Sequence, residues 1–143
     1  MTKLLRKVRS DDGFTLLELL VVLAIMGLLA AIIAPQVLKY LGTSRTQTAK
    51  VQIQNIGAAL ELYRLDIGHY PNQDEGLAAT VAAPPNAAGW NGPYLVKRAA
   101  LIDPWGQPYL YRSPGKHGEV DIYSLGSDKA EGGTGEAADV GNW

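Results

Sequence analysis

The apolar positions near the start of the chain form one continuous run. From Phe14 to Ala34, Glu18 is the only charged residue. As a helix this run would be about 31 Å long, which matches the hydrocarbon core of a bilayer. It is too long for an ordinary secretory signal, and it lacks the small-residue cleavage site that ends one. The run therefore predicts a transmembrane helix.

A second pattern begins after Pro35, where apolar residues recur at steps of three and four, as on an amphipathic helix. Gly68 and Pro71 should end this helix, because glycine adopts the left-handed cap and proline cannot continue a helix. The pattern predicts one long helix with a soluble second half, bent near Pro35 and loosened at Gly42. Its apolar stripe comprises Ala49, Ile53, Ile56, Leu60, Tyr63 and Ile67.

The remainder of the chain predicts short elements. One or two helical turns are expected over 77–81. Strands are expected over 109–112 and 120–124, joined by a turn rich in proline and glycine, and this small sheet would cover the apolar stripe. The last stretch, 126–143, has little to bury and should be an irregular loop unless something binds it. The fold class is therefore α+β.

Composition and charge narrow the possible partners. The 143-residue chain carries 13 basic and 14 acidic residues and a net charge of -1, so no broad basic surface favours nucleic acid. Its expected partners are proteins and lipid. The absence of cysteine excludes a disulfide framework, a thiolate metal site and a cysteine nucleophile.

Basic residues precede the apolar run and define a leader over residues 1–13. Slightly more basic residues stand before the run than soon after it, which favours a cytoplasmic N-terminus by a small margin. The basic residues before the run are Lys3, Arg6, Lys7 and Arg9, and those after it are Lys39, Arg45 and Lys50.

The junction of leader and apolar run reads Gly-Phe-Thr-Leu-Leu-Glu over residues 13–18. This resembles the processing site of type IV prepilins and pseudopilins. The resemblance implies that a prepilin peptidase cleaves between Gly13 and Phe14 and methylates the new amine of Phe14. The alternative is a signal anchor with a stray Glu18.

Glu18 needs a partner, because a charged carboxylate within a membrane costs about 2.5 to 3.5 kcal/mol. Cleavage would create a positive amine at Phe14. On the resemblance, Glu18 of one subunit would pair with this amine on the next subunit and set the axial step of a homopolymer. The alternative is a pair within one helix, since the two residues are four apart.

Four motifs stand in the second half of the chain: Gly68-His69-Tyr70-Pro71, Asp103-Pro104-Trp105-Gly106-Gln107-Pro108-Tyr109, Tyr123-Ser124-Leu125-Gly126-Ser127-Asp128 and Asp139-Val140-Gly141-Asn142-Trp143. Together they are similar to the motifs of the major pseudopilins of bacterial type II secretion systems.

The resemblance implies a type IV pilin-like fold, in which a long N-terminal helix packs against a small antiparallel sheet with a C-terminal loop. It divides the chain into a leader over 1–13, a transmembrane and polymerisation helix over 14–34, and a periplasmic domain over 35–143. It further implies a single-pass protein of the inner membrane that polymerises into a periplasmic pseudopilus and drives export of folded proteins. Its partners would be minor pseudopilins, the prepilin peptidase, an inner-membrane assembly platform and membrane lipid.

Two alternatives remain. One is the major subunit of a type IV pilus for adhesion or motility, although the commonest type IV pilins close their C-terminal region with a disulfide that this chain cannot form. The other is a membrane-anchored periplasmic binding protein or enzyme. No catalytic residue is expected, because His69 and His117 lack triad spacing and no serine has a nucleophile-elbow frame.

The resemblance also implies a structural calcium ion in the C-terminal loop. Asp128 and the Leu125 carbonyl would be ligands, Asp139 would close the site, and Glu136 and the Ala130 carbonyl would complete it. Calcium takes six to eight oxygen ligands, which such a loop offers. Within the resemblance, Ala138 stands before Asp139 where some family members have a second aspartate. Without the resemblance the residues favour a solvated acidic loop, and no EF-hand spacing follows Asp128.

Overall fold

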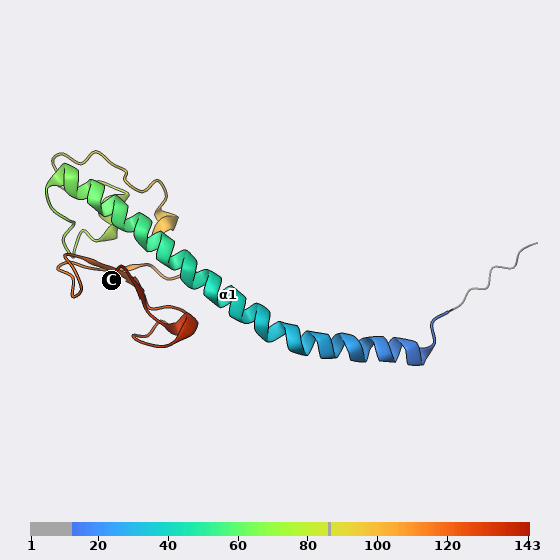
Figure 1. The fold of residues 1–143 in the computed structure, drawn as a ribbon. Coiled ribbons are helices and arrows are strands. Elements are labelled where there is room, and N and C mark those ends of the chain that lie inside the picture. The colour runs from blue at the N-terminus through green and yellow to red at the C-terminus, as the bar shows by residue number, and fades with distance from the viewer. Residues whose placement is uncertain (1–12, 86) are drawn as a thin grey trace, which may run out of the picture. The chain divides into compact units, whose positions relative to one another are not determined.

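The computed structural model describes residues 13–85 and 87–143 (Figure 1). The predicted leader, apart from Gly13, lies outside the described residues. The chain divides into two compact units, the first ending at Leu38 and the second comprising Lys39–Trp143. The long helix begins in the first unit and ends in the second.

This helix, α1, comprises Leu16–Ile67 and contains Pro35. It is assigned as continuous α-helix through Pro35 and Gly42, so the loosening expected at Gly42 is wrong. Gly42 is instead a packed position, buried against the C-terminal loop. The most apolar 18-residue window of α1 has a mean hydropathy of 2.9 and buries none of its residues inside the chain. Length and composition thus suit a membrane span.

The soluble end of α1 confirms the predicted stop and stripe. Gly68 has a φ of 92° and donates its N–H to the Arg64 carbonyl at 2.8 Å, which closes the last turn. Ile67 is only half-buried, because it lies at this end. The other five stripe residues, Ala49, Ile53, Ile56, Leu60 and Tyr63, are at most 1% exposed.

Three short strands form one antiparallel sheet in the order β1-β2-β3. β1 is Leu110–Arg112, β2 is Asp121–Ser124 and β3 is Val140–Gly141. The two predicted strands each begin one residue later than expected. β3 was not predicted: its Val140 pairs with Ser124 of β2, so the last stretch is not wholly irregular.

Three short 3-10 helices are also found among the described residues. The first, η1, is Leu77–Thr80 and confirms the predicted turns. The other two, η2 (Arg98–Leu101) and η3 (Gly135–Ala137), were not predicted. One apolar cluster joins the α1 stripe to the sheet, and the residues that it adds are Leu77, Tyr109, Val120, Ile122 and Val140.

Candidate functional site

The N-terminus of α1 holds the predicted processing and assembly residues. Gly13, Phe14 and Thr15 precede the helix, and Phe14 is 83% exposed. Glu18 accepts the backbone N–H of Thr15 at 3.4 Å, and the Thr15 hydroxyl accepts the N–H of Glu18 at 3.2 Å. This is a capping box, which satisfies two backbone donors at the helix start. Its Thr-x-x-Glu spacing is visible in the sequence, and the sequence interpretation missed it.

The first half of α1 presents apolar side chains that nothing in the chain covers. From Phe14 to Leu41 every large apolar residue is at least 49% exposed. A monomeric soluble protein seldom exposes such a surface, so this half requires lipid or other helices around it.

The C-terminal loop, residues 125–139, is closed by hydrogen bonds between its two ends. Ser127 donates its N–H to the Glu136 carbonyl at 2.9 Å. Asp139 donates its N–H to the Gly132 carbonyl at 3.2 Å, and Gly132 donates to the Asp139 carboxylate at 3.0 Å. Lys129 has a φ of 60°, a left-handed conformation that costs an L-residue about 1 to 2 kcal/mol. The loop is therefore ordered, with local strain beside Asp128.

Several oxygen atoms in this loop accept no hydrogen bond from the described residues. The Asp139 Oδ1 and Glu136 Oε1 atoms are both buried and have no hydrogen-bond partner, although Glu136 Oε1 lies 3.8 Å from the Arg45 guanidinium. The carbonyl oxygens of Leu125 and Ala130 accept no hydrogen bond from the described residues. Asp128 is exposed and uses its Oδ1 to accept the Ala130 N–H at 3.1 Å. A buried carboxylate oxygen without a donor fits an oxygen-seeking cation.

The five predicted ligands are not all directed to one point. Glu136 turns its carboxylate towards α1, 3.8 Å from the Arg45 guanidinium. Leu125 lines a cavity of about 210 Å³, and Asp139 lines another of about 220 Å³. Within the described ranges no three His, Asp or Glu side chains group closely enough to hold a metal ion, so any cation here would depend on carbonyl oxygens.

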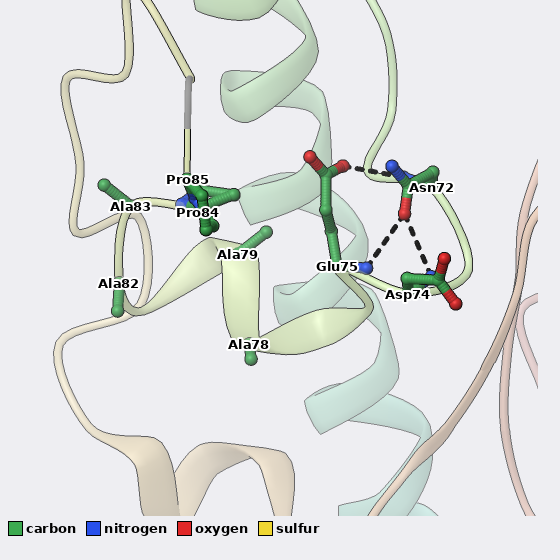
Figure 2. Close-up of a pocket in the computed structure, with 9 residues that line it drawn as sticks. All are labelled: Asn72, Asp74, Glu75, Ala78, Ala79, Ala82, Ala83, Pro84 and Pro85. Atoms are coloured by element: carbon green, nitrogen blue, oxygen red, sulfur yellow. Dashed lines mark hydrogen bonds between the residues drawn. The ribbon is translucent and has the colours of Figure 1, made fainter.

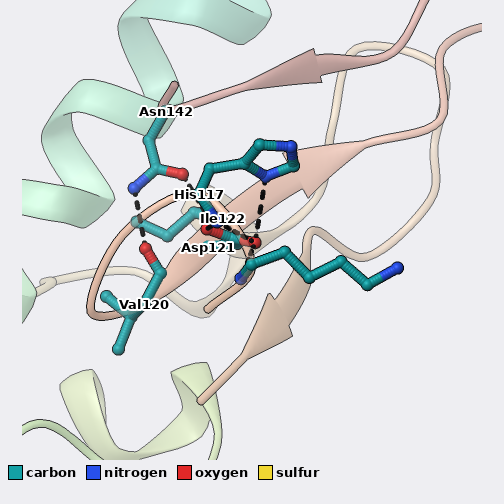
Figure 3. Close-up of polar contacts among 6 residues, drawn as sticks. His117, Val120, Asp121, Ile122 and Asn142 are labelled. Carbon is teal, nitrogen blue, oxygen red and sulfur yellow. Dashed lines mark hydrogen bonds and ion pairs between the residues drawn. The ribbon is translucent and has the colours of Figure 1, made fainter. Parts of the chain in front are cut away.

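A polar cluster next to this loop was not predicted (Figure 3). Asp121 is 2% exposed and accepts the N–H groups of Lys116 at 2.7 Å and His117 at 3.2 Å. Its carboxylate also lies 3.2 Å from His117 Nδ1. Burial alone would raise the pKa of Asp121, but these hydrogen bonds hold the pKa below its ordinary value.

Asn142 and Trp143 attach the end of the chain to this cluster. The Asn142 side chain accepts the Ile122 N–H and donates to the Val120 carbonyl, both at 3.0 Å (Figure 3). The Trp143 ring stacks on the His117 imidazole with centroids 4.0 Å apart. Since these contacts join segments about twenty residues apart, no local sequence signal identifies them.

The largest of the described cavities is an open cleft of about 440 Å³ beside η1 (Figure 2). Alanine and proline side chains line most of it. Its polar residues are engaged with one another, because Asn72 accepts the N–H groups of Asp74 and Glu75, both at 2.9 Å. The described residues of its lining include no pair of nucleophile and base.

Comparison with known proteins gives consistent matches over almost the whole chain. Residues 36–143 match the family described as type II secretion system protein G, and residues 8–34 match the prokaryotic N-terminal methylation motif. The chain is 44% identical to the type II secretion system core protein G of Pseudomonas aeruginosa, covering 94% of this chain and 96% of the relative. It is 43% identical to the core protein G of Vibrio cholerae, covering 97% and 96%.

A solved structure is also similar. It is the major pseudopilin of the type 2 secretion system of enterohaemorrhagic Escherichia coli, at 30% identity and a TM-score of 0.61, covering 71% of this chain and 88% of that one.

Proposed function

This chain belongs to the type II secretion system protein G family and is a subunit of the secretion pseudopilus, and from this premise we propose how it matures and assembles. The family is one of structural pseudopilins, with an apolar N-terminal helix and a methylation motif. We propose that the chain has no catalytic role and that its work is mechanical. The relatives favour this function over a type IV pilus subunit or a periplasmic enzyme.

Maturation begins with cleavage between Gly13 and Phe14 by the prepilin peptidase, followed by methylation of the Phe14 amine. The exposure of Phe14 and the non-helical backbone of residues 13–15 support this, because a peptidase needs an accessible, extended peptide. The helix then remains anchored in the inner membrane with the rest of the chain in the periplasm.

Assembly places the exposed apolar half of α1 among the same helices of other copies. This exposed surface is the observation that carries the proposal, because only lipid or neighbouring helices can cover it. Glu18 of one copy pairs with the Phe14 amine of the next, which fixes the register of the fibre. The assembly platform and minor pseudopilins would add and initiate subunits, and the growing fibre would move folded proteins outward.

Coexpression with and without the peptidase tests the maturation step. Mass spectrometry should find Phe14 as the methylated N-terminus only when the peptidase is present. An uncut leader in the presence of active peptidase contradicts the proposal.

Two substitutions of Glu18 separate the role of its charge from its role in the capping box. Glutamine at N3 can keep a capping box but carries no charge, whereas alanine loses both. We expect Glu18→Gln and Glu18→Ala to abolish fibres and secretion alike, measured by electron microscopy and by exoprotein in the medium. If Glu18→Gln assembles as wild type does, the intersubunit ion pair is wrong.

We further propose that the C-terminal loop holds a structural calcium ion. Asp139 and Asp128 supply carboxylates, and Leu125 and Ala130 supply carbonyls, as the unused oxygens of these residues suggest. Bound calcium would neutralise the two carboxylates and cross-link the ends of the loop. Ordering this loop would in turn strengthen the pairing of β3 with β2.

Chelation tests the metal. Adding EGTA should lower the melting temperature of the mature chain in detergent micelles, and Asp139→Asn should remove that difference. Asp74→Asn, a change at an exposed carboxylate outside the loop, is the control and should keep that difference. A melting temperature that is the same with added calcium and with EGTA would refute the calcium proposal.

A further inference from the structure

Glu136 makes a close contact between the C-terminal loop and α1. A Cβ atom added at Gly42 would lie 2.5 Å from Cγ and 2.6 Å from Cδ of Glu136. Nonbonded carbon atoms do not approach so closely, so a larger residue at position 42 would displace the Glu136 side chain from this place. Gly42 is buried although both its neighbours are exposed, which shows how local the contact is.

The backbone of Glu136 is held equally tightly at the base of the loop. Its carbonyl accepts the Ser127 N–H and lies 2.5 Å from where a Cβ of Gly126 would be. Gly126 has a φ of 69°, so this position also favours glycine. Glu136 thus has its backbone fixed by one segment and its side chain fixed by another.

We propose that Glu136 is a positioning residue whose contact with Gly42 holds the C-terminal loop against α1, rather than a metal ligand. Its Oε1 atom is buried without a hydrogen-bond partner and lies 3.8 Å from the guanidinium of Arg45, which is on α1 like Gly42. Along α1 from its start, Gly42 is the first buried residue. Within the second unit, the loop therefore packs on α1 at the first buried position of that helix.

Through this contact the C-terminal loop can also affect α1, and this effect rests on the proposed calcium site only in part. If calcium orders the loop, Glu136 transmits that order to α1 at residues 42–45. Without calcium, the contact between Glu136 and Gly42 still positions the loop. Two measurements separate these statements.

A double-mutant cycle tests the contact itself. The readout is hydrogen–deuterium exchange of residues 126–139 in the mature chain, in detergent micelles without added calcium. We expect Gly42→Ala to raise the exchange rate about tenfold, because its methyl group displaces Glu136. In a Glu136→Ala background, where nothing meets that methyl group, Gly42→Ala should change the rate by less than about twofold.

Gly57→Ala is the matched control on the same helix. Its Cβ would meet only Ile122 Cδ1 at 3.8 Å, an ordinary contact, so loop exchange should not rise. A tenfold rise from Gly42→Ala in both backgrounds, or no rise in the wild-type background, overturns the proposal.

Calcium titration separates positioning from ligation. Asp139→Asn should weaken calcium binding at least about tenfold, because affinity depends on ligand charge. Glu136→Gln should weaken it by less than about threefold, whereas a loss equal to that of Asp139→Asn would make Glu136 a ligand and refute the proposal. If the wild-type chain binds no calcium, the calcium proposal fails, and the exchange cycle still decides the role of Glu136.

Discussion

At the scale of single residues, two acidic side chains stabilise the backbone by accepting its hydrogen bonds. Glu18 caps α1 through Thr15, and Asp121 accepts two N–H groups of the turn before β2. Hydrogen bonds to a charged acceptor contribute about 1.5 to 3 kcal/mol each, more than an exposed ion pair. Asp121 should therefore stabilise the fold more than an exposed ion pair does, although it lies outside every motif that the sequence suggested.

The lowered pKa of Asp121 predicts an acid-sensitive fold. Because its folded-state pKa lies below the ordinary value of 3.8, its stabilisation is fully present above that value and is lost as the pH falls through the folded-state pKa. Asp121→Asn should destabilise the chain by about 2 kcal/mol at pH 7 and flatten the loss of stability below about pH 4. Tryptophan fluorescence during denaturation would measure both.

Asp74→Asn serves as the comparison, since Asp74 is an exposed carboxylate of the η1 cleft. This substitution should leave the loss of stability below about pH 4 unchanged. An Asp121→Asn chain whose stability falls with acid as steeply as wild type contradicts the assigned role.

At the scale of elements, α1 combines two environments in one helix. Its first half exposes its large apolar side chains, and its second half buries one stripe against the sheet. Hydrogen bonds across β2 and β3 and the Asn142 side chain close the sheet over this stripe. Two-residue strands are too short to be stable alone, so packing on α1 must support them.

The stripe predicts a contrast between two leucines of α1. Leu60 is 1% exposed and Leu62 is 52% exposed. Leu60→Ala should lower the free energy of unfolding by about 3 kcal/mol because it leaves a cavity in the core. Leu62→Ala should cost less than about 0.5 kcal/mol. Chemical denaturation of the mature chain in micelles, followed by tryptophan fluorescence, would compare them, and equal costs would contradict the packing.

At the scale of the whole molecule, the two units have separate tasks. The apolar unit that ends at Leu38 is the part for which we propose membrane and fibre contacts, and Lys39–Trp143 forms the folded core. All three tryptophans lie in the second unit, so their fluorescence reports on that core. A change in the first unit should therefore affect assembly without affecting the melting of the second.

Leu23→Asp tests this division. A charge in the centre of the span costs about 2.5 to 3.5 kcal/mol on insertion, so the chain should be lost from the membrane fraction and form no fibres. The melting midpoint of the tryptophan signal should stay within about 1 °C of wild type. Leu65→Asp, at a residue 78% exposed in the second unit, should remain in the membrane fraction. A Leu23→Asp chain that melts early would show that the units are not independent.

The sequence alone determined the features that depend on local periodicity and backbone chemistry. The apolar run, the α1 stripe and the stop at Gly68 follow from spacing along one helix, and the first two strands follow from alternation and turn residues. The Thr15–Glu18 capping box belongs to the same class, because its partners are three residues apart.

Tertiary structure alone decided the contacts between distant segments. Several contacts join residues that no period or short motif relates. They are the pairing of β3, the contacts of Asn142 and His117, and the contact of Glu136 with Gly42. Gly42 illustrates the difference: within the helix pattern it predicts loosening, and only the packed loop gives it a role. A local pattern fixes which backbone conformation is favoured, whereas the packing of one segment on another depends on which surfaces the whole chain brings together.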